Sequence, residues 1–257
     1  MKKNRIILLL AAVLWLASSV SAATVERIAV RSEAMKKDIP VVVIVPDAAK
    51  SGVRMPVLYL LHGYSGDQET WLNVKPSLPQ MADRDSVIVV CPDGENSWYW
   101  DSPRDPSSRF ETFVARELID YVDARYPTRA DRSGRAITGL SMGGHGGLWL
   151  SFRHKETFGA GGSTSGGVDI RPFPENWEMA KQLGEEATNR KVWDDHTVMT
   201  QLDSIANGDL ALVIDCGYDD FFFDVNNKLH EALRERGIEH DYTVRPGVHN
   251  GPYWTNS

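Results

Sequence analysis

The sequence lacks several features that define common classes of protein. Only two of its 257 residues are cysteines, Cys91 and Cys216, which excludes a small disulfide-rich scaffold. Both follow apolar segments that we expect to form strands that are not neighbours. Because a disulfide needs Cα atoms within about 7 Å of each other, we expect two free, buried thiols rather than a bridge.

Long hydrophobic runs and an excess of basic residues are also missing. The apolar run over residues 6–16 is too short to span a bilayer. Lysine and arginine number 28 against 35 aspartate and glutamate residues, so the net charge is −7. Such a chain has little affinity for nucleic acid or for an anionic membrane. The seven histidines lack metal-ligand spacing and no glycine-rich loop suits a nucleotide, so we expect no metal and no cofactor.

The first 22 residues are typical of a cleaved signal peptide. Residues 1–5 are mostly basic, residues 6–16 are apolar, and residues 18–22 include the small residues that signal peptidase needs. We expect cleavage after Ala22 or Ala23 and a single exported domain, periplasmic or secreted, over residues 23–257. The alternative is an uncleaved N-terminal anchor. Cleavage removes three basic residues and no acidic one, so the mature net charge becomes −10.

Strand and helix patterns alternate through the remaining chain. Residues 25–32 and 39–45 predict an N-terminal β-hairpin. Further strands are expected over residues 57–61, 87–90, 136–138, 159–163, 210–214 and 241–244, and helices over residues 71–84, 113–125, 143–154 and 226–236. This alternation indicates an α/β fold with a mostly parallel sheet and helices on both faces. The irregular segment 171–207 is predicted to be an insertion or lid.

The turn after residues 136–138 carries the clearest chemical motif. It reads Gly139-Leu140-Ser141-Met142-Gly143-Gly144, a G-x-S-x-G sequence between a strand and a helix. So sharp a turn strains the backbone of the serine, requires glycine beside it, and exposes the hydroxyl at the carboxyl edge of the sheet. The helix N-terminus below favours developing negative charge. Ser141 is therefore the candidate nucleophile.

A nucleophilic serine needs a base, and the base needs an orienting acid. In this kind of fold the chain order is serine, acid, histidine. His249 is the one histidine that follows the last predicted strand at the expected edge. Asp219 and Asp220 both qualify by position as the acid, although an acidic pair before a helix is also typical of N-terminal capping.

The same chemistry needs two backbone N–H groups to bind an oxyanion. Met142, directly after Ser141, is expected to supply one. The loop after residues 57–61 is expected to supply the other through the N–H of Tyr64. These residues together indicate a serine hydrolase that works through an acyl-enzyme.

Four segments of the chain carry a family resemblance, and they are Leu61-His62-Gly63, Gly139–Gly144, Cys216–Asp220 and Pro246-Gly247-Val248-His249. Together they resemble the esterase D-type family of α/β-hydrolases, which includes feruloyl and acetyl-xylan esterases, tributyrin esterases, S-formylglutathione hydrolases and mycolyltransferases. The resemblance covers roughly residues 30–254 and implies an α/β-hydrolase fold. It also implies that the acid is Asp220 rather than Asp219. Members of the family usually continue into a C-terminal helix that covers one sheet face, whereas this sequence stops at Ser257.

Aromatic residues suggest where a substrate binds. Trp98, Tyr99 and Trp100 follow the strand at 87–90, and we expect them to bind substrate together with His62 and Trp177; the alternative for each aromatic is plain packing. An exported acidic esterase with such residues suggests removal of acetyl or feruloyl groups from polysaccharide side chains.

Two other functions stay open on the sequence. An acyltransferase would use the same three residues with a sugar hydroxyl in place of water. A non-catalytic carbohydrate-binding relative would keep the scaffold without turnover. Hydrolysis of S-formylglutathione is disfavoured, because that thiol is cytosolic and this chain carries an export signal. The oligomeric state is not predicted.

Overall fold

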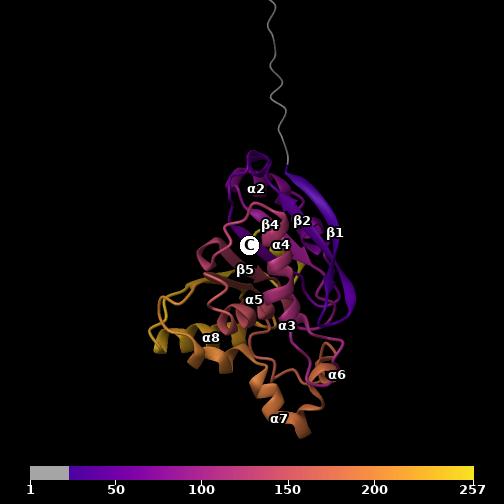
Figure 1. Cartoon of the computed structure of the whole chain (residues 1–257). Helices are drawn as coiled ribbons and strands as arrows, with labels where there is room; N and C mark the ends of the chain where they lie inside the picture. Colours follow the sequence, from indigo (N-terminus) through magenta and orange to yellow (C-terminus); the bar gives the residue numbers. More distant parts are fainter. Residues whose placement is uncertain (1–22) are drawn as a thin grey trace, which may run out of the picture.

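A computed structural model describes residues 23–257, and the predicted signal peptide lies outside the described residues. Eight strands form one sheet in the order β1-β2-β4-β3-β5-β6-β7-β8. The pairs β1–β2 and β2–β4 are antiparallel, and every other neighbouring pair is parallel. The α/β-hydrolase fold and the N-terminal hairpin that the sequence predicts are therefore confirmed (Figure 1).

Strands and helices alternate along the chain after the hairpin. The strands are β1 (Thr24–Ser32), β2 (Lys37–Val45), β3 (Val57–Leu61), β4 (Ile88–Pro92), β5 (Arg135–Gly139), β6 (Ala160–Thr164), β7 (Ala211–Gly217) and β8 (Asp241–Arg245). The α-helices are α1 (Thr70–Val74), α2 (Leu78–Asp85), α3 (Phe110–Thr112), α4 (Leu118–Arg125), α5 (Met142–Arg153), α6 (Met179–Leu183), α7 (Glu186–Asp195), α8 (Phe223–Glu235) and α9 (Gly251–Thr255). The 3-10 helices are η1 (Asp47–Ser51), η3 (Arg132–Gly134) and η4 (Val198–Ser204), and η2 (Phe113–Glu117) is a π-helix.

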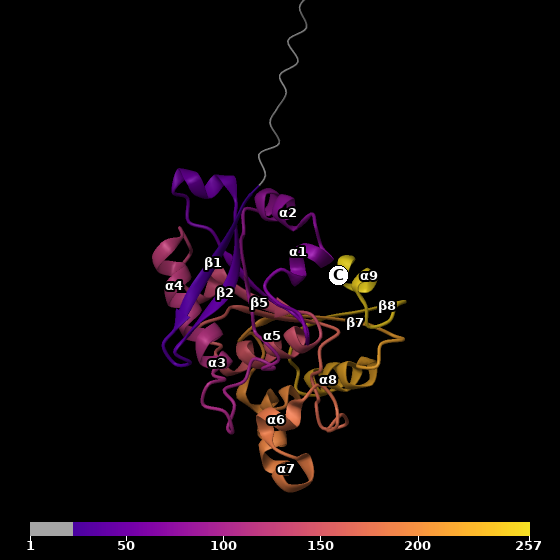
Figure 2. The same cartoon turned by 90° about the vertical axis from the view of Figure 1, so that its right-hand side faces the viewer.

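Helices cover both faces of the sheet, as the sequence predicts (Figure 2). On one face α4, α5 and α8 pack over buried strand residues such as Tyr59 and Ile137. On the other face α1 and α2 place Trp71 and Leu78 against Leu60 of β3. Because successive strand residues point to opposite faces, strands covered on both sides must be apolar at every position, which explains the continuous apolar runs.

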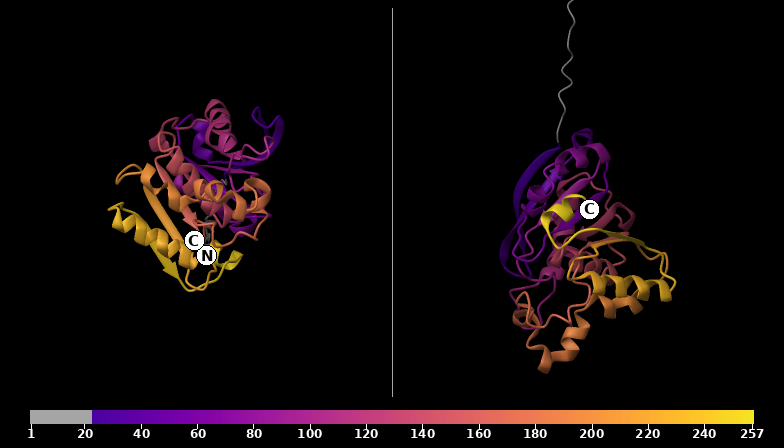
Figure 3. Two further views of the ribbon diagram at one scale, coloured as in Figure 1. Left: turned by 90° about the horizontal axis from the view of Figure 1, so that it is seen from below. Right: turned by 180° about the vertical axis from the view of Figure 1, so that it is seen from behind.

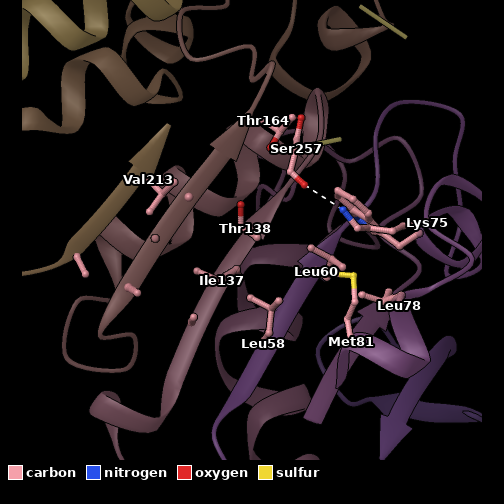
Figure 4. Close-up of a pocket in the computed structure, with 16 residues that line it drawn as sticks. Leu58, Leu60, Lys75, Leu78, Met81, Ile137, Thr138, Thr164, Val213 and Ser257 are labelled. Carbon is pink, nitrogen blue, oxygen red and sulfur yellow. Dashed lines mark hydrogen bonds between the residues drawn. The ribbon is translucent and has the colours of Figure 1, made fainter. Parts of the chain in front are cut away.

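The end of the chain returns to its first third. Helix α9 lies beside α1 (Figure 3). The amino group of Lys75 donates to the backbone oxygens of Thr255 and Ser257 at 3.0 and 3.2 Å. Next to this contact, β3, β5, β6 and β7 form the floor of an apolar groove of about 370 Å³, which Leu78 and Met81 of α2 border on one side (Figure 4). The last helix among residues 23–257 is the five-residue α9.

Two predicted helices differ from the sequence-based expectation. The helix expected over residues 71–84 is interrupted, because Pro76 has no N–H to donate and excludes a helical conformation for Lys75 before it (φ −132°, ψ 78°). Helices α1 and α2 result. The helix expected over 113–125 instead begins at Phe110, with the π-helical turn η2 between α3 and α4.

Both cysteines are free and buried, as expected. Cys91 lies on β4 and Cys216 on β7, and three strands separate β4 from β7 in the sheet. Residues 171–207 contain α6, α7 and η4, and α6 and α7 extend away from the sheet beyond α5 (Figure 1). Whether this segment acts as a lid stays a prediction. None of the helices within residues 23–257 is long and apolar enough to cross a membrane.

Candidate active site

Ser141 occupies the sharp turn between β5 and α5. Its backbone is strained, with φ at 58° and ψ at −117°, a region that residues other than glycine rarely adopt. The two flanking glycines have no room for a side chain. A Cβ on Gly139 or on Gly143 would lie 2.5 or 2.3 Å from the carbonyl oxygen of Leu61. The turn therefore exists only with glycine at both positions, as the motif predicts.

The structure brings Ser141, His249 and Asp220 together from three separate loops. His249 Nε2 lies 2.8 Å from Ser141 Oγ. His249 Nδ1 lies 2.8 and 3.0 Å from the two carboxylate oxygens of Asp220. Because the carboxylate can only accept, Nδ1 carries the proton and Nε2 is free to accept from the serine hydroxyl. This arrangement can remove a proton from Ser141.

Asp220 rather than Asp219 is the residue at His249. The Asp220 carboxylate is completely buried, and its Oδ1 also accepts the backbone N–H of Phe222 at 2.8 Å. The same side chain thus contacts the histidine and holds the turn that leads into α8. Asp219 is exposed, and its backbone N–H donates to the carbonyl of Gly247 at 3.1 Å.

The His249 loop is anchored on both sides. Before it, Arg245 at the end of β8 forms an ion pair with Asp215 of β7 at 2.9 Å and lies over the ring of Tyr253, 4.4 Å from its centroid. After it, the Asn250 side chain accepts the N–H of Tyr253 at 3.0 Å and so caps α9. These contacts hold the imidazole at the carboxyl edge of the sheet.

Two aromatic rings confine the imidazole itself. The ring of Phe221 lies 4.2 Å from that of His249, and the ring of Trp254 lies 4.9 Å away at a right angle. Sequence reasoning missed the role of Phe221. Its role could have been inferred from the position of Phe221, which directly follows the acid in the loop that must approach the histidine.

The predicted oxyanion donors both lie beside the serine. The N–H of Met142 is at the first turn of α5, where helix amides have no intrahelical acceptor. The Gly63–Tyr64 peptide is next to Ser141, because a Cβ built on Gly63 would lie 3.2 Å from the Ser141 Cβ. Among the described residues, the Tyr64 N–H donates to no other group. Both amides are therefore available to an oxyanion.

A cavity of about 360 Å³ opens at Ser141 and His249. Besides His249, four aromatic residues line it, namely Tyr64, Trp177, Phe221 and Trp254, and its lining also includes Thr70 and Leu140. Trp177 stacks on Phe221 with ring centroids 5.7 Å apart and an interplanar angle of 25°. Trp177 is thus the one predicted substrate-binding residue that the structure places in the cavity wall.

The structure places the other predicted substrate-binding residues behind the site, where they are buried. Trp98, Tyr99, Trp100 and His62 are at most 1% exposed, and none of them lines the cavity at Ser141. Trp98 stacks on Trp100, with ring centroids 5.6 Å apart. An apolar cluster at the catalytic edge has the same sequence pattern whether its rings face the cavity or the core, so the sequence alone did not distinguish them.

His145, on α5 one turn after the nucleophile, belongs to this buried layer. Its Nε2 accepts the indole N–H of Trp100 at 2.9 Å, and its Nδ1 contacts the carbonyl of Gly167 at 3.1 Å. Burial lowers the pKa of His145 to about 3. The folded protein therefore holds this histidine neutral at pH values where the unfolded chain protonates it.

This difference predicts an acid-dependent loss of stability. Above pH 6.5 His145 is neutral in both states, and as the pH falls toward its folded pKa only the unfolded state gains a proton. One such histidine lowers the free energy of unfolding by about 2 kcal/mol between pH 6.5 and pH 5. Urea unfolding of wild type and His145→Asn at pH 7 and pH 5 measures this. The variant should lose about 2 kcal/mol less than wild type between these pH values; equal losses would contradict the assignment.

A family model and several known sequences are similar to this chain. A sequence model of the family described as "Putative esterase" matches residues 32–257. An acetyl esterase of Caldicellulosiruptor saccharolyticus is 28% identical over 214 residues, which is 78% of this chain and 79% of that protein. Esterase Rv1288 of Mycobacterium tuberculosis is 28% identical over 234 residues, which is 80% of this chain and 51% of that protein. This chain therefore spans about half the length of the mycobacterial relative.

Solved structures share the fold over nearly the whole chain. The fluorophosphonate-binding serine hydrolase F of Staphylococcus aureus, with substrate bound, has a TM-score of 0.83 and 20% identity, covering 92% of this chain and 95% of that one. A ferulic acid esterase has a TM-score of 0.74 and 27% identity, covering 91% and 94%. At 20% identity, the similarity to the staphylococcal hydrolase shows a shared fold alone. The ferulic acid esterase shares the fold and is also more similar in sequence, at 27% identity. Among residues 23–257, no three histidine, cysteine or acidic side chains are grouped as metal ligands.

Proposed function

This chain belongs to the esterase family, and from that premise we propose that Ser141, His249 and Asp220 are the catalytic triad of this serine carboxylic ester hydrolase. The single observation that carries the proposal is the continuous set of contacts from Ser141 Oγ through His249 to Asp220, each 2.8 Å long at its shortest. Membership of this family and the complete triad favour catalysis over the non-catalytic carbohydrate-binding alternative.

The reaction that this geometry supports has two halves. In acylation, His249 Nε2 takes the hydroxyl proton while Ser141 Oγ attacks the ester carbonyl carbon. The histidine then gives this proton to the leaving alcohol as the ester C–O bond breaks. In deacylation, His249 removes a proton from water as the water attacks the acyl carbon. The histidine then returns this proton to Ser141 Oγ as the bond between Oγ and the acyl carbon breaks, which releases the acid and the free serine. Asp220 keeps the Nδ1 proton in place and stabilises the imidazolium.

The developing oxyanion is bound by backbone amides. We assign its two donors to the N–H groups of Met142 and Tyr64, which lie beside Ser141 and have no competing acceptor among the described residues. Fixed donors of this kind typically contribute a factor of about 10²–10³ to kcat each. The positive end of α5, whose first residue is Met142, favours the same negative charge.

For the substrate we propose acetyl or feruloyl esters on polysaccharide side chains. The matched acetyl esterase and the similar ferulic acid esterase structure support this choice. The aromatic walls of the cavity support an aromatic acyl group in particular, because flat rings such as Trp177 and Phe221 stack favourably on another ring. A volume of about 360 Å³ leaves room for a group larger than acetyl.

Replacing Trp177 tests whether the aromatic side of the cavity contacts the acyl group. Trp177→Ala removes a ring that stacks on Phe221 and should lower kcat/KM for methyl ferulate about three- to tenfold, the value of one aromatic contact. The same variant should leave kcat/KM for p-nitrophenyl acetate within about twofold, because an acetyl group is too small to stack on this ring. Taking the ratio of the two constants removes any loss of folded enzyme. An unchanged ratio would rule out Trp177 as part of the acyl wall.

The experiment for the substrate class is an ester panel on the purified enzyme. Acetylated xylan and feruloylated arabinoxylan are compared with methyl ferulate and p-nitrophenyl acetate by release of free acid. Release from one of the polysaccharides, at a rate comparable with its small-ester counterpart, is expected. Turnover of the small esters alone would remove the polysaccharide from the proposal and leave the esterase in place.

We also propose that the enzyme is exported after cleavage of residues 1–22. The basic start, the apolar run and the small residues of this segment support the proposal. Cleavage after Ala22 is favoured over cleavage after Ala23, because Ala23 is buried in the same apolar cluster as Trp71 and Leu78. N-terminal sequencing of enzyme recovered from the extracytoplasmic fraction should begin at Ala23. Recovery of chains that still begin at Met1 would contradict export by cleavage.

A further inference from the structure

His62 contacts backbone on both sides of its ring although it never reaches the cavity. It follows β3 directly and is 1% exposed. Its Nδ1 lies 2.7 Å from the carbonyl oxygen of Gly63, and its Nε2 accepts the N–H of Gly94 at 2.7 Å. Asp93 Oδ1 is 3.5 Å from the same Nε2, at the outer limit of hydrogen bonding. The imidazole thus joins the loop after β3 to the loop after β4.

These partners fix the tautomer of His62. A backbone N–H can only donate, so the Nε2 that receives the Gly94 N–H has no proton of its own. In the neutral ring the proton then lies on Nδ1, which donates to Gly63 O. The ring therefore acts as a donor toward the loop that contains Tyr64 and as an acceptor toward the loop that contains Gly94.

The carbonyl that His62 contacts belongs to the oxyanion peptide itself. Gly63 C=O and Tyr64 N–H are the two ends of one planar peptide unit, and in a trans peptide they point in opposite directions; no cis peptide occurs among the described residues. Fixing the oxygen on the protein side therefore directs the N–H to the other side. Gly66 N–H donates to the same oxygen at 3.0 Å, so two donors hold this carbonyl.

We propose that His62 is a positioning residue that orients and polarises the Gly63–Tyr64 peptide, so that the Tyr64 N–H meets the oxyanion. The proposal rests on the function proposed above, in which that N–H is an oxyanion donor. Donors at the carbonyl end of a peptide strengthen its N–H as a donor, since hydrogen bonds in a chain polarise one another. The geometry thus places His62 behind the site as its support, in place of the substrate contact that the sequence suggested.

Two amide variants separate the two hydrogen bonds of the ring. The side-chain amide of asparagine reaches the position of Nδ1, and that of glutamine reaches the position of Nε2. His62→Asn keeps the donor to Gly63 O and should retain kcat within about threefold of wild type. His62→Gln keeps the contact to Gly94 and loses the donor, so kcat should fall about ten- to a hundredfold with KM nearly unchanged.

An inhibition constant and a control variant distinguish a positioning role of His62 from a contribution to stability alone. Phenylboronic acid forms a tetrahedral adduct on serine with an oxygen in the oxyanion site, so its inhibition constant should rise in His62→Gln in parallel with the loss of kcat. The control is Thr128→Val, which removes a partly buried hydrogen bond to Asp123 at the opposite end of the sheet. It should lower the melting temperature and leave kcat and the inhibition constant unchanged.

Failure of the positioning role of His62 can be distinguished from failure of the proposed esterase function. If wild type hydrolyses esters and Ser141→Ala does not, equal kcat values for wild type and His62→Gln overturn the positioning role while the triad stands. If His62→Gln does not fold, the ¹⁵N shifts of His62 in the wild-type enzyme decide the matter. They should report a protonated Nδ1 and an unprotonated Nε2 at pH 7, and the opposite tautomer or a doubly protonated ring overturns the proposal.

Discussion

Replacing Ser141 by alanine is expected to lower kcat for p-nitrophenyl acetate by about 10⁴- to 10⁶-fold, the range found when a serine nucleophile is removed. Without Oγ no acyl-enzyme forms, and His249 is left facing a methyl group. Fold and stability should change little, because the lost hydrogen bond is partly exposed and contributes about 1 kcal/mol. Steady-state rates and thermal unfolding of the same preparation measure both effects.

A matched control lies on the same helix. Ser151 on α5 is buried, and its hydroxyl donates to the carbonyl of Leu148 at 3.2 Å, away from the cavity. Ser151→Ala should retain wild-type kcat. Residual activity of Ser141→Ala within tenfold of wild type would show that another group attacks the ester, and the assignment of Ser141 would then fail.

The second large effect is expected at the orienting acid. Asp220→Asn keeps the shape of the side chain but replaces an acceptor pair with an amide, which favours the wrong tautomer of His249 and leaves the imidazolium unpaired. The expected loss in kcat is about 10⁴-fold, as in other serine hydrolases with this change. The buried position of the carboxylate makes the effect large, because no water can replace it.

Asp219 provides the comparison for Asp220. It is adjacent in sequence, exposed, and outside the set of contacts to His249. The kcat of Asp219→Asn should stay within about twofold of the wild-type value, since solvent screens the interaction of an exposed carboxylate with the active site. A large loss in Asp219→Asn with little loss in Asp220→Asn would reverse the assignment, and measuring both variants on one ester is sufficient.

Local rules made much of the fold predictable from the sequence. Apolar runs such as residues 57–61 gave strands because a parallel sheet buried on both faces accepts nothing else. Gly139 and Gly143 revealed the turn at Ser141 because only glycine fits against the Leu61 carbonyl. The order of the chain then restricted the base to His249, and the structure brings it within 2.8 Å of the serine.

Side-chain orientation across the catalytic edge was beyond the sequence. Trp98, Tyr99 and Trp100 occupy the loop from which substrate contacts are expected, yet they point into the core. Their direction depends on the positive φ values of Trp98 and Tyr99, 56° and 62°, which residues of this type rarely adopt and no local rule predicts. Phe221 was missed for the converse reason, because its role arises from its proximity to His249 and Trp177, which are remote in sequence.

The helix boundaries and the choice between Asp219 and Asp220 were only partly predictable from the sequence. Pro76 explains the break between α1 and α2 once it is considered, since it has no N–H to donate. The two aspartates were equivalent by position, and resemblance to a family favoured Asp220. The structure separates them physically, because one carboxylate faces His249 and the other faces solvent.

The proposed mechanism requires Ser141 to carry the acyl group during turnover. Mixing the enzyme with excess p-nitrophenyl acetate, quenching in acid within milliseconds and mapping peptides by mass spectrometry tests this claim directly. We expect one acetyl group per chain, located on Ser141, at the time of the burst of p-nitrophenol. An acetyl group on another residue, or a burst with Ser141 unmodified, would contradict the proposed mechanism.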